Sequence, residues 1–457
     1  MKTSNSDTKV TPSRSPGNSR RRFLKQSAVA GIGIGALGRI PSLYGQNAPS
    51  RRINVAVMGV NSRGDVLAQT FAQATGAEVV YVCDVDSRAV EKTVAAVASH
   101  QQRTPQGIGD FRRALDDDDV DALVIAAPDH WHAPATLLAL QAGKHVYVEK
   151  PCGHNPREGE LLAEAMYAHD RIVQMGNQQR SAPRSIEIIG EIHNGIIGRP
   201  YFGRAWYANT RGSIGHGRTA PVPDWLDYEL WQGPAPRTAY RDNVVHYNWH
   251  WFWRWGTAEI NNNGTHEIDV CRWALQVDYP SRVTSAGGRF HFDDDWEMYD
   301  TQVASYEFEG GTSITWEGRS CNGRPIEGRA RGVAIHGEEG TVIIDRNGYV
   351  VYDLANNEVK RKIQGETDSA LDIRGGGNMT AQHIDNFLES IRGNERPTAP
   401  VDDGQRSSLL CHLGNIAQRT GRALHCDPSN GHIIDDPEAM GYWSREYEPG
   451  WEPSVSG

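Results

Sequence analysis

The feature that most restricts the fold is a pattern at residues 53–84. A short apolar run at 53–58 ends in a turn with glycine at its first and last positions, 59–64. A helical pattern then leads to a second apolar run that ends in Asp84. Strand, glycine turn, helix, strand and acid in this order form the βαβ fingerprint of dinucleotide-binding sheets. The pattern therefore predicts a parallel sheet that binds a nucleotide.

The turn also supplies most of the predicted cofactor contacts. A helix N-terminus presents unpaired N–H groups to a pyrophosphate, and the residues expected there are Gly59, Asn61, Ser62, Arg63 and Gly64. Asn61 stands where the fingerprint has its middle glycine. Asp84, 20 residues after Gly64, is placed to accept hydrogen bonds from ribose hydroxyls. Its charge favours NAD over NADP, whereas Arg88 would soften that preference. An ordinary βα turn without a nucleotide is the alternative.

Strands and helices continue to alternate as far as residue 176. A buried strand at 120–127 leads to Pro128-Asp129-His130-Trp131-His132 and a helix at 134–142, and a strand at 145–148 leads to Glu149-Lys150-Pro151. In doubly wound sheets, ligands bind beyond the carboxyl ends of the strands. We therefore expect an α/β Rossmann domain with a doubly wound parallel sheet over 52–176. Four more of its residues should contact the cofactor: Pro128, His132, Glu149 and Lys150.

Residues 177–457 follow a different pattern. Alternating strands are expected at 303–308, 312–316, 332–335 and 340–344, with hairpin signals between them. Helices are expected at about 379–392 and 404–422. The pattern predicts an α+β domain with a large, mostly antiparallel sheet that completes the cofactor cleft.

The first 48 residues differ from the rest in charge. They carry eight Lys or Arg and one acid, a net charge of +7. Because the whole chain has a net charge of −10, the remaining residues have a net charge of −17. Ser-Arg-Arg-Arg-Phe-Leu-Lys at 19–25 resembles a twin-arginine export signal, and the uncharged run at 28–38 is too short for a permanent membrane span. We expect a leader at 1–48, recognition by the twin-arginine machinery and a periplasmic or otherwise exported enzyme. A basic amphipathic tail is the alternative. The acidic remainder argues against nucleic acids and anionic polymers as partners.

Tryptophan is concentrated in one part of the chain. Seven of the 13 Trp residues lie between 206 and 255. Indole faces pack well on the apolar faces of sugar rings, so Trp251 and Trp253 are candidate substrate contacts. Core packing is the alternative.

Five motifs together resemble the Gfo/Idh/MocA family of nicotinamide-dependent sugar oxidoreductases, in its exported branch. They are Gly59-x-Asn61-x-x-Gly64, Pro128-Asp129-His130-Trp131-His132, Gly143-Lys144-His145-Val146-Tyr147, Glu149-Lys150-Pro151 and Gly176-Asn177-Gln178-Gln179-Arg180-Ser181. The resemblance implies a nicotinamide cofactor, for which Asp84 favours NAD with NADP as the alternative. Because the twin-arginine pathway exports folded proteins, we expect this cofactor to be loaded before export and held tightly. It also implies a small carbohydrate substrate and a homo-oligomer that pairs through the second sheet.

By the same resemblance, Lys150 and His266 are the catalytic pair that flanks the reacting carbinol. The family pattern Asp-x-x-x-His has Asn262 in place of the aspartate here, and Asp269 lies one helical turn after His266. A lysine whose pKa is lowered in a partly desolvated cleft can accept the hydroxyl proton. The expected substrate contacts are Gln178, Arg180, Asn262 and Asp269, besides the two tryptophans. For Arg180, a salt bridge is the alternative. No metal is expected, because His130 and His132 lack a third ligand at a familiar spacing.

Three functions remain open at this point. The first is net oxidation or reduction of a sugar, glycoside or polyol. The second resembles the family's glycosidase branch, in which a hydroxyl is oxidised transiently and the redox change is reversed. That branch shows Tyr-Pro-Thr-His, whereas residues 263–266 here read Asn-Gly-Thr-His, so it ranks second. The third is a non-catalytic binding protein.

Overall fold

The computed structural model describes residues 52–363 and 377–456. Its N-terminal part contains a six-stranded sheet in the order β3-β2-β1-β4-β5-β6, in which neighbouring strands pair in parallel. The strands are β1 (Ile53–Met58), β2 (Ala77–Cys83), β3 (Gln106–Ile108), β4 (Ala122–Ile125), β5 (His145–Val148) and β6 (Val173–Met175). The strand order reverses between β1 and β4, which is where doubly wound sheets bind ligands. The predicted Rossmann sheet is confirmed.

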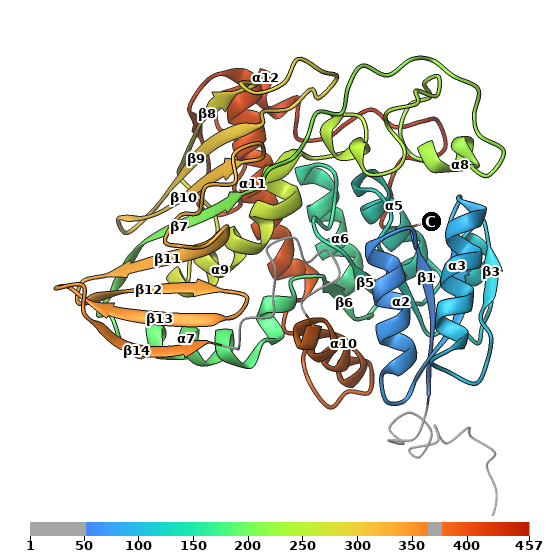
Figure 1. The fold of residues 1–457 in the computed structure, drawn as a ribbon, viewed down its shortest axis with the longest axis horizontal. Coiled ribbons are helices and arrows are strands. Elements are labelled where there is room, and N and C mark those ends of the chain that lie inside the picture. Colours follow the sequence, from blue (N-terminus) through green and yellow to red (C-terminus); the bar gives the residue numbers. More distant parts are fainter. Residues whose placement is uncertain (1–51, 364–376, 457) are drawn as a thin grey trace, which may run out of the picture. The chain divides into compact units, whose positions relative to one another are not determined.

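Helices cover both faces of this sheet, as Figure 1 shows. They are α2 (Arg63–Gln73), α3 (Ser87–Ala98), α4 (Arg112–Leu115), α5 (Asp129–Gln141) and α6 (Pro156–Ala168). Helix α10 (Gly377–Ile391), far away in the sequence, packs on α2, where the rings of Phe387 and Phe71 lie 6.2 Å apart. One apolar cluster lies on each face of the sheet.

Helix α5 begins five residues earlier than the sequence predicts, at Asp129 instead of Pro134. Proline inside a helix lacks the N–H that would bond to the carbonyl four residues before it. Here that carbonyl, of His130, accepts a hydrogen bond from Arg445 Nη2 at 2.8 Å. The C-terminal segment thus satisfies the group that Pro134 leaves free. As a result, His130 and His132 lie in a helical first turn and not in a loop.

The second sheet has nine strands in the order β14-β13-β12-β11-β7-β10-β9-β8-β15. Its pairs are antiparallel except for β10 with β7. The strands are β7 (Pro200–Ala208), β8 (Arg282–Gly288), β9 (Thr301–Phe308), β10 (Thr312–Arg319), β11 (Arg331–Gly337), β12 (Gly340–Asp345), β13 (Gly348–Asp353), β14 (Glu358–Ile363) and β15 (Leu424–His425). The predicted mostly antiparallel sheet is confirmed, and the α+β class with it.

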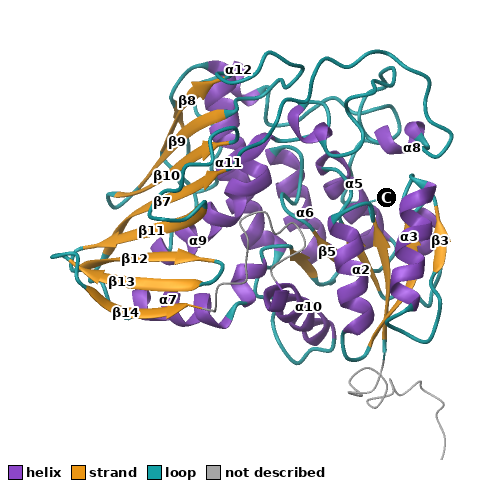
Figure 2. Cartoon of the chain, in the orientation of Figure 1, coloured by secondary structure: helices purple, strands orange, loops and turns teal. Residues whose placement is uncertain are grey.

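Helices connect the two sheets. The longest, α11 (Val401–Thr420), packs on α6 on one side and on β8 on the other, and α9 (Thr265–Leu275) packs on β7. Figure 2 shows them between the sheets. Helix α7 (Pro183–His193) lies against β13, and the short α8 (Tyr228–Gln232) and α12 (Pro437–Met440) belong to the loops around the sheets. The main apolar cluster fills the space between the large sheet and its helices.

The segment before α9 is a π-helical turn, Ile260–Gly264. Such turns widen the helix by one residue and occur frequently at functional sites. Asn262 lies in this turn, and His266 is the second residue of α9.

The predicted export leader, residues 1–48, lies outside the described residues. In 52–363 and 377–456, no helix combines the length and the apolar character that crossing a bilayer requires.

Candidate active site

A large pocket opens beyond the carboxyl ends of β1, β4 and β5. The glycine turn, the first turn of α5 and residues 149–150 line it from the Rossmann side. Residues of β7, β11, the π-turn and the loop at 246–250 line it from the other side. The pocket therefore lies where the fold places a cofactor, and the second domain completes it.

Steric contacts require glycine at both ends of the turn. Gly59 has φ +83°, and a Cβ there would lie 2.4 Å from the backbone nitrogen of Ala127. A Cβ on Gly64 would lie 2.1 Å from the carbonyl oxygen of Gly59. These approaches leave no room for a side chain, so both glycines serve the packing that the fingerprint predicts.

The N-terminus of α2 fits a pyrophosphate. Ser62 occupies the cap position but makes no side-chain cap hydrogen bond, so the first-turn N–H groups lack the usual side-chain partner. Asn61, Ser62 and Arg63 all line the pocket. The Arg63 side chain turns instead to Glu149, with Nε 2.8 Å from Oε1.

The adenosine end of the pocket is acidic. Asp84, which is buried, accepts hydrogen bonds from the N–H groups of Val60 (2.7 Å) and Asp86 (2.9 Å). A carboxylate has about four acceptor positions, so others remain for ribose hydroxyls. Asp86 in turn lies 3.0 Å from His246 Nε2 and accepts hydrogen bonds from Arg88. Arg88 itself is outside the pocket lining.

The guanidinium of Arg88 stacks 3.5 Å above the centroid of the Trp225 ring. Asp86, Trp225 and His246 were not predicted. The loops that contain Trp225 and His246 contact the end of β2 although they lie more than a hundred residues later in the chain. No local sequence pattern predicts that contact.

Glu149 is part of a buried network beside the reaction centre. Its carboxylate pairs with Arg63 and accepts a hydrogen bond from Gln178 Nε2 at 3.1 Å. Gln178 also donates to the hydroxyl of Tyr147 at 3.0 Å. Burial acts to raise the pKa of Glu149, but the nearby cations hold it below its usual value. Gln178 lines the pocket as predicted, while its amide holds this framework.

Lys150 points across the cleft to the π-turn. Its Nζ donates to the Asn262 carbonyl oxygen at 2.5 Å and lies 3.3 Å from Asn262 Oδ1. Burial is the main cause that lowers the pKa of Lys150 from its usual value, opposed in part by Glu149 and Asp129. A lysine held between neutral oxygens in this way is suited to exchange a proton with a substrate hydroxyl.

His266 faces the same space from the start of α9. It is 8% exposed, lines the pocket and has no hydrogen-bond partner among the described residues. Burial, followed by the nearby cations of Arg346, Lys150 and Arg331, keeps its pKa well below the usual value. Its imidazole is therefore neutral and able to accept a proton at neutral pH.

The first turn of α5 completes the floor of the pocket. His132 is held by two carbonyl oxygens, that of Pro151 at 2.5 Å from Nδ1 and that of Ala127 at 2.8 Å from Nε2. Pro128 also lines the pocket. His130 lies in the core, where burial lowers its pKa to about 3. In the part of the chain that the structure describes, no group of three His, Cys, Asp or Glu side chains could hold a metal.

Four predicted substrate residues do not line the pocket. Arg180 and Asp269 form a buried bidentate pair with distances of 2.7 and 2.8 Å. Trp251 is fully buried and stacks on Trp296 at 3.9 Å, while Trp253 lies under Arg419. Their positions favour packing and do not favour the substrate contacts that the sequence predicted.

Other residues, which the sequence analysis did not select, line the substrate side. They are Tyr207, Asn209, Arg211, Trp231, Tyr247, Trp249, His250, Asn263, Arg331 and Arg346. Arg211 pairs with Glu259 at 2.7 Å and donates to the hydroxyl of Tyr247 at 2.5 Å. Arg331 pairs with Glu267 at 2.7 Å. Period-two patterning in β7 and β11 marks strands but does not tell which side chains reach a cleft.

Two family models match this chain. The model of the Gfo/Idh/MocA oxidoreductase family with an NAD-binding Rossmann fold matches residues 53–177, and that of its C-terminal α/β domain matches 200–343. Together they cover more than half of the chain.

Curated relatives of the chain are glycosidases by name. A glycosyl hydrolase family 109 protein of Saccharopolyspora erythraea is 30% identical over 260 residues, which cover 50% of this chain and 56% of the relative. An α-N-acetylgalactosaminidase of Tannerella forsythia is 23% identical over 93% of this chain and 98% of its own length. For the former and for a similar protein of Shewanella, the match spans about half of the relative.

Solved structures share the fold. A levoglucosan dehydrogenase in complex with NADH and levoglucosan superposes with a TM-score of 0.64 at 18% identity, over 82% of this chain and 99% of the other. The aldose-aldose oxidoreductase of Caulobacter crescentus gives 0.62 at 18% identity, over 82% of this chain and all of the other. With both domains matched in sequence and in fold, the chain belongs to the NAD-binding Gfo/Idh/MocA family.

Proposed function

We propose that this protein is an exported, NAD-dependent glycosidase that oxidises a sugar hydroxyl transiently and restores it after the glycosidic bond is cleaved. The sequence motifs alone ranked net oxidation first and this reaction second. The relatives reverse that order, because the match to the Tannerella enzyme runs along nearly the whole chain.

The observation that carries the proposal is the number of proton-transfer groups in one pocket. Lys150, His266 and the hydroxyl of Tyr247 all line it. A net dehydrogenase needs one base for the hydroxyl proton. An elimination route also needs a base for a carbon-bound proton and an acid for the leaving oxygen. The pocket offers a separate group for each task.

Bound NAD would supply one chemistry, the removal of a hydride from a carbinol carbon and its later return. The turn at residues 59–64 and Asp84 would hold it. Lys150 Nζ takes the proton of the hydroxyl that becomes a ketone, and Asn262 keeps this nitrogen in place. The ketone acidifies the neighbouring C–H bond, and neutral His266 takes that proton.

The glycosidic C–O bond then breaks by elimination, and Tyr247 donates its hydroxyl proton to the leaving oxygen. Arg211, which donates a hydrogen bond to the Tyr247 hydroxyl oxygen, stabilises the negative charge that develops on this oxygen. Water adds to the double bond and gives its second proton back to Tyr247. His266 exchanges the proton that it took with solvent and protonates the neighbouring carbon, and reduction of the ketone, with the proton held by Lys150, restores the hydroxyl. The net change is one water consumed and one glycosidic bond cleaved.

The test uses purified enzyme with its co-purified nucleotide and a panel of p-nitrophenyl glycosides. We expect nitrophenol release with no net accumulation of NADH. NADH formed in proportion to sugar consumed would instead support the second candidate, a net sugar dehydrogenase. One observation favours that candidate: residues 263–264 are Asn-Gly, where the glycosidase branch has Tyr-Pro.

Export through the twin-arginine pathway is part of the proposal and rests on residues 19–25. We expect the wild-type protein in the periplasmic fraction with its nucleotide bound. Replacing Arg20 and Arg21 together by lysine should retain the protein in the cytoplasm. The control replaces Lys2 and Lys9 by arginine, which also exchanges two basic residues, and should leave export unchanged. Equal export of both variants would contradict the assignment.

A further inference from the structure

Among the residues that the structure describes, one arginine at the substrate end of the pocket, Arg346, has no partner. The three other arginines of the pocket each have a carboxylate: Arg63 pairs with Glu149, Arg211 with Glu259 and Arg331 with Glu267, at 2.7–2.8 Å. Arg346 lines the same pocket but makes no hydrogen bond or ion pair with any described residue. The local charge is therefore not balanced.

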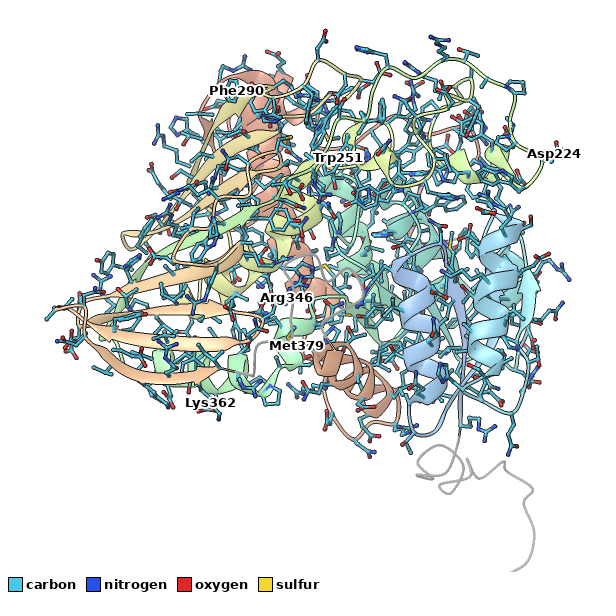
Figure 3. The ribbon with its side chains drawn as sticks, in the orientation of Figure 1. Asp224, Trp251, Phe290, Arg346, Lys362 and Met379 are labelled. Atoms are coloured by element: carbon cyan, nitrogen blue, oxygen red, sulfur yellow. The ribbon has the colours of Figure 1, made fainter. Side chains whose placement is uncertain are left out.

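The protein holds Arg346 in place through its neighbours. Arg346 lies in the turn between β12 and β13, at the end of this hairpin nearer the six-stranded sheet (Figure 3). Asp345 fixes the turn by accepting hydrogen bonds from the N–H groups of Asn347 (2.8 Å) and Gly348 (3.0 Å). The Asp345 side chain also pairs with Arg329 at 2.6 Å, so the nearest carboxylate in sequence is already engaged.

The guanidinium faces the reacting groups. Its charge is the largest electrostatic influence on His266 after burial, and it also acts on Lys150. Burial, together with the repulsion from Arg331, lowers the pKa of Arg346 to about 9. Glu267 attracts this charge but is already paired with Arg331. A desolvated cation without an ion pair of its own is costly, and an arginine fork matches two oxygens of a carboxylate or sulfate.

We propose that Arg346 binds an anionic group of the substrate, so that the preferred glycoside carries a carboxylate or a sulfate ester close to the carbons that react. This inference rests on the proposed glycosidase function and names its substrate class. The overall charge of −17 outside the leader disfavours long anionic polymers at a distance, whereas a small anion inside the pocket meets a local excess of cations.

The first test compares matched substrates that differ at one group. The panel holds p-nitrophenyl α- and β-glucosides and galactosides, the corresponding glucuronides and galacturonides, and the 6-sulfated sugars. For wild-type enzyme we expect at least about tenfold higher kcat/KM for one anionic sugar than for its neutral partner. The uronides and the sulfated sugars separate the two sources of negative charge.

The variant Arg346→Gln should lower kcat/KM for that anionic substrate about 10- to 100-fold more than it lowers kcat/KM for the neutral partner. Arg324→Gln is the matched control, because it removes the same charge from an exposed residue outside the pocket. An Arg346→Gln loss that is equal for neutral and anionic sugars, or a loss of co-purified NAD, would overturn the proposal. A wild-type enzyme that cleaves anionic and neutral glycosides equally well would also overturn the proposal.

A binding arm keeps this test separate from the glycosidase activity. The NAD-loaded protein is melted in the presence of glucuronate, galacturonate, glucose 6-sulfate or galactose 6-sulfate, with glucose and galactose as neutral references. We expect one of the anionic sugars to raise Tm at a concentration at least about tenfold lower than its neutral reference does, and Arg346→Gln to abolish that difference. If no glycoside is cleaved but this difference appears, only the proposed function fails. If it does not appear, the anionic site is refuted.

Discussion

The two ends of the pocket have opposite charge. At the adenosine end, Asp84 and Asp86 lie at the end of β2 and their carboxylates face backbone N–H groups, Arg88 and His246. At the reaction end, cations surround His266, and Arg346 forms no ion pair with a residue of 52–363 or 377–456. The two ends therefore suit different ligands. Carboxylates at one end can accept hydrogen bonds from ribose hydroxyls, and the cationic side chains at the other end can donate hydrogen bonds to the substrate. The net charge of the chain, a sum over all residues, predicts neither the acidic end nor the basic end of the pocket.

The largest effect is expected at Lys150. Lys150→Ala should reduce turnover at least ~100-fold with NAD still bound, because the acid/base group is lost and the cofactor turn is intact. Lys150→Arg should be nearly as inactive, since a guanidinium keeps the charge but does not release its proton. Steady-state kinetics and the nucleotide content of the purified variants measure both results. Near-normal turnover of either variant would remove Lys150 from the mechanism.

The acidic end is tested at Asp84. Asp84→Asn replaces an acceptor of two backbone N–H bonds with an amide that can accept only one of them, and it removes a negative charge. We expect about tenfold weaker NAD binding and a smaller preference for NAD over NADP. Calorimetry on nucleotide-free protein measures both affinities. Asp224→Asn, at an exposed position (Figure 3), is the control and should change neither.

Two neighbouring tryptophans separate the pocket wall from the core. Trp251→Ala removes a fully buried ring stacked on Trp296 and should cost about 3–5 kcal/mol of unfolding free energy. Trp249→Ala changes a ring that lines the pocket, so it should raise KM up to about tenfold with little loss of stability. Denaturant titration and kinetics on both variants distinguish the roles. The reverse outcome would restore the sequence-based assignment of Trp251 to the substrate.

The smallest effect concerns pH. Lys150 acts as a base only when neutral, and its pKa is lowered, so kcat/KM should rise with pH through an apparent pKa below the usual 10.5 of lysine. His266 also has a lowered pKa, so its protonation should reduce activity only well below pH 6.5. A pH–rate profile checks both limbs. An acid limb near pH 6.5 would show that His266 is not the desolvated base described above.

Sequence patterns predicted the parts of the site that depend on local geometry. Gly59, Asp84 and Lys150 all lie at the ends of parallel strands, where a fingerprint fixes both residue type and position. His266 followed from a family motif at the start of a helix. These residues line the pocket because strand ends in a doubly wound sheet converge there.

The remaining residues depend on contacts that are distant in the sequence. Asp269 has the spacing to reach His266, but Arg180, almost ninety residues earlier, takes its carboxylate. Trp251 and Trp253 were expected to contact the substrate, yet Asn248–Trp251 forms a 3-10 helix from which Trp249 and not Trp251 lines the pocket. Arg346 reaches the pocket only because the register of β12 and β13 places their turn there.

The most direct measurement is cleavage of a p-nitrophenyl glycoside in D₂O, followed by mass spectrometry and NMR of the released sugar. Elimination and addition exchange the proton on the carbon next to the transient ketone, whereas the returned hydride keeps its original hydrogen. We predict one deuterium per cleavage on the neighbouring carbon, none on the carbon that was oxidised, and no net NADH. Hydrolysis without deuterium, or a ketosugar formed together with NADH, would contradict it.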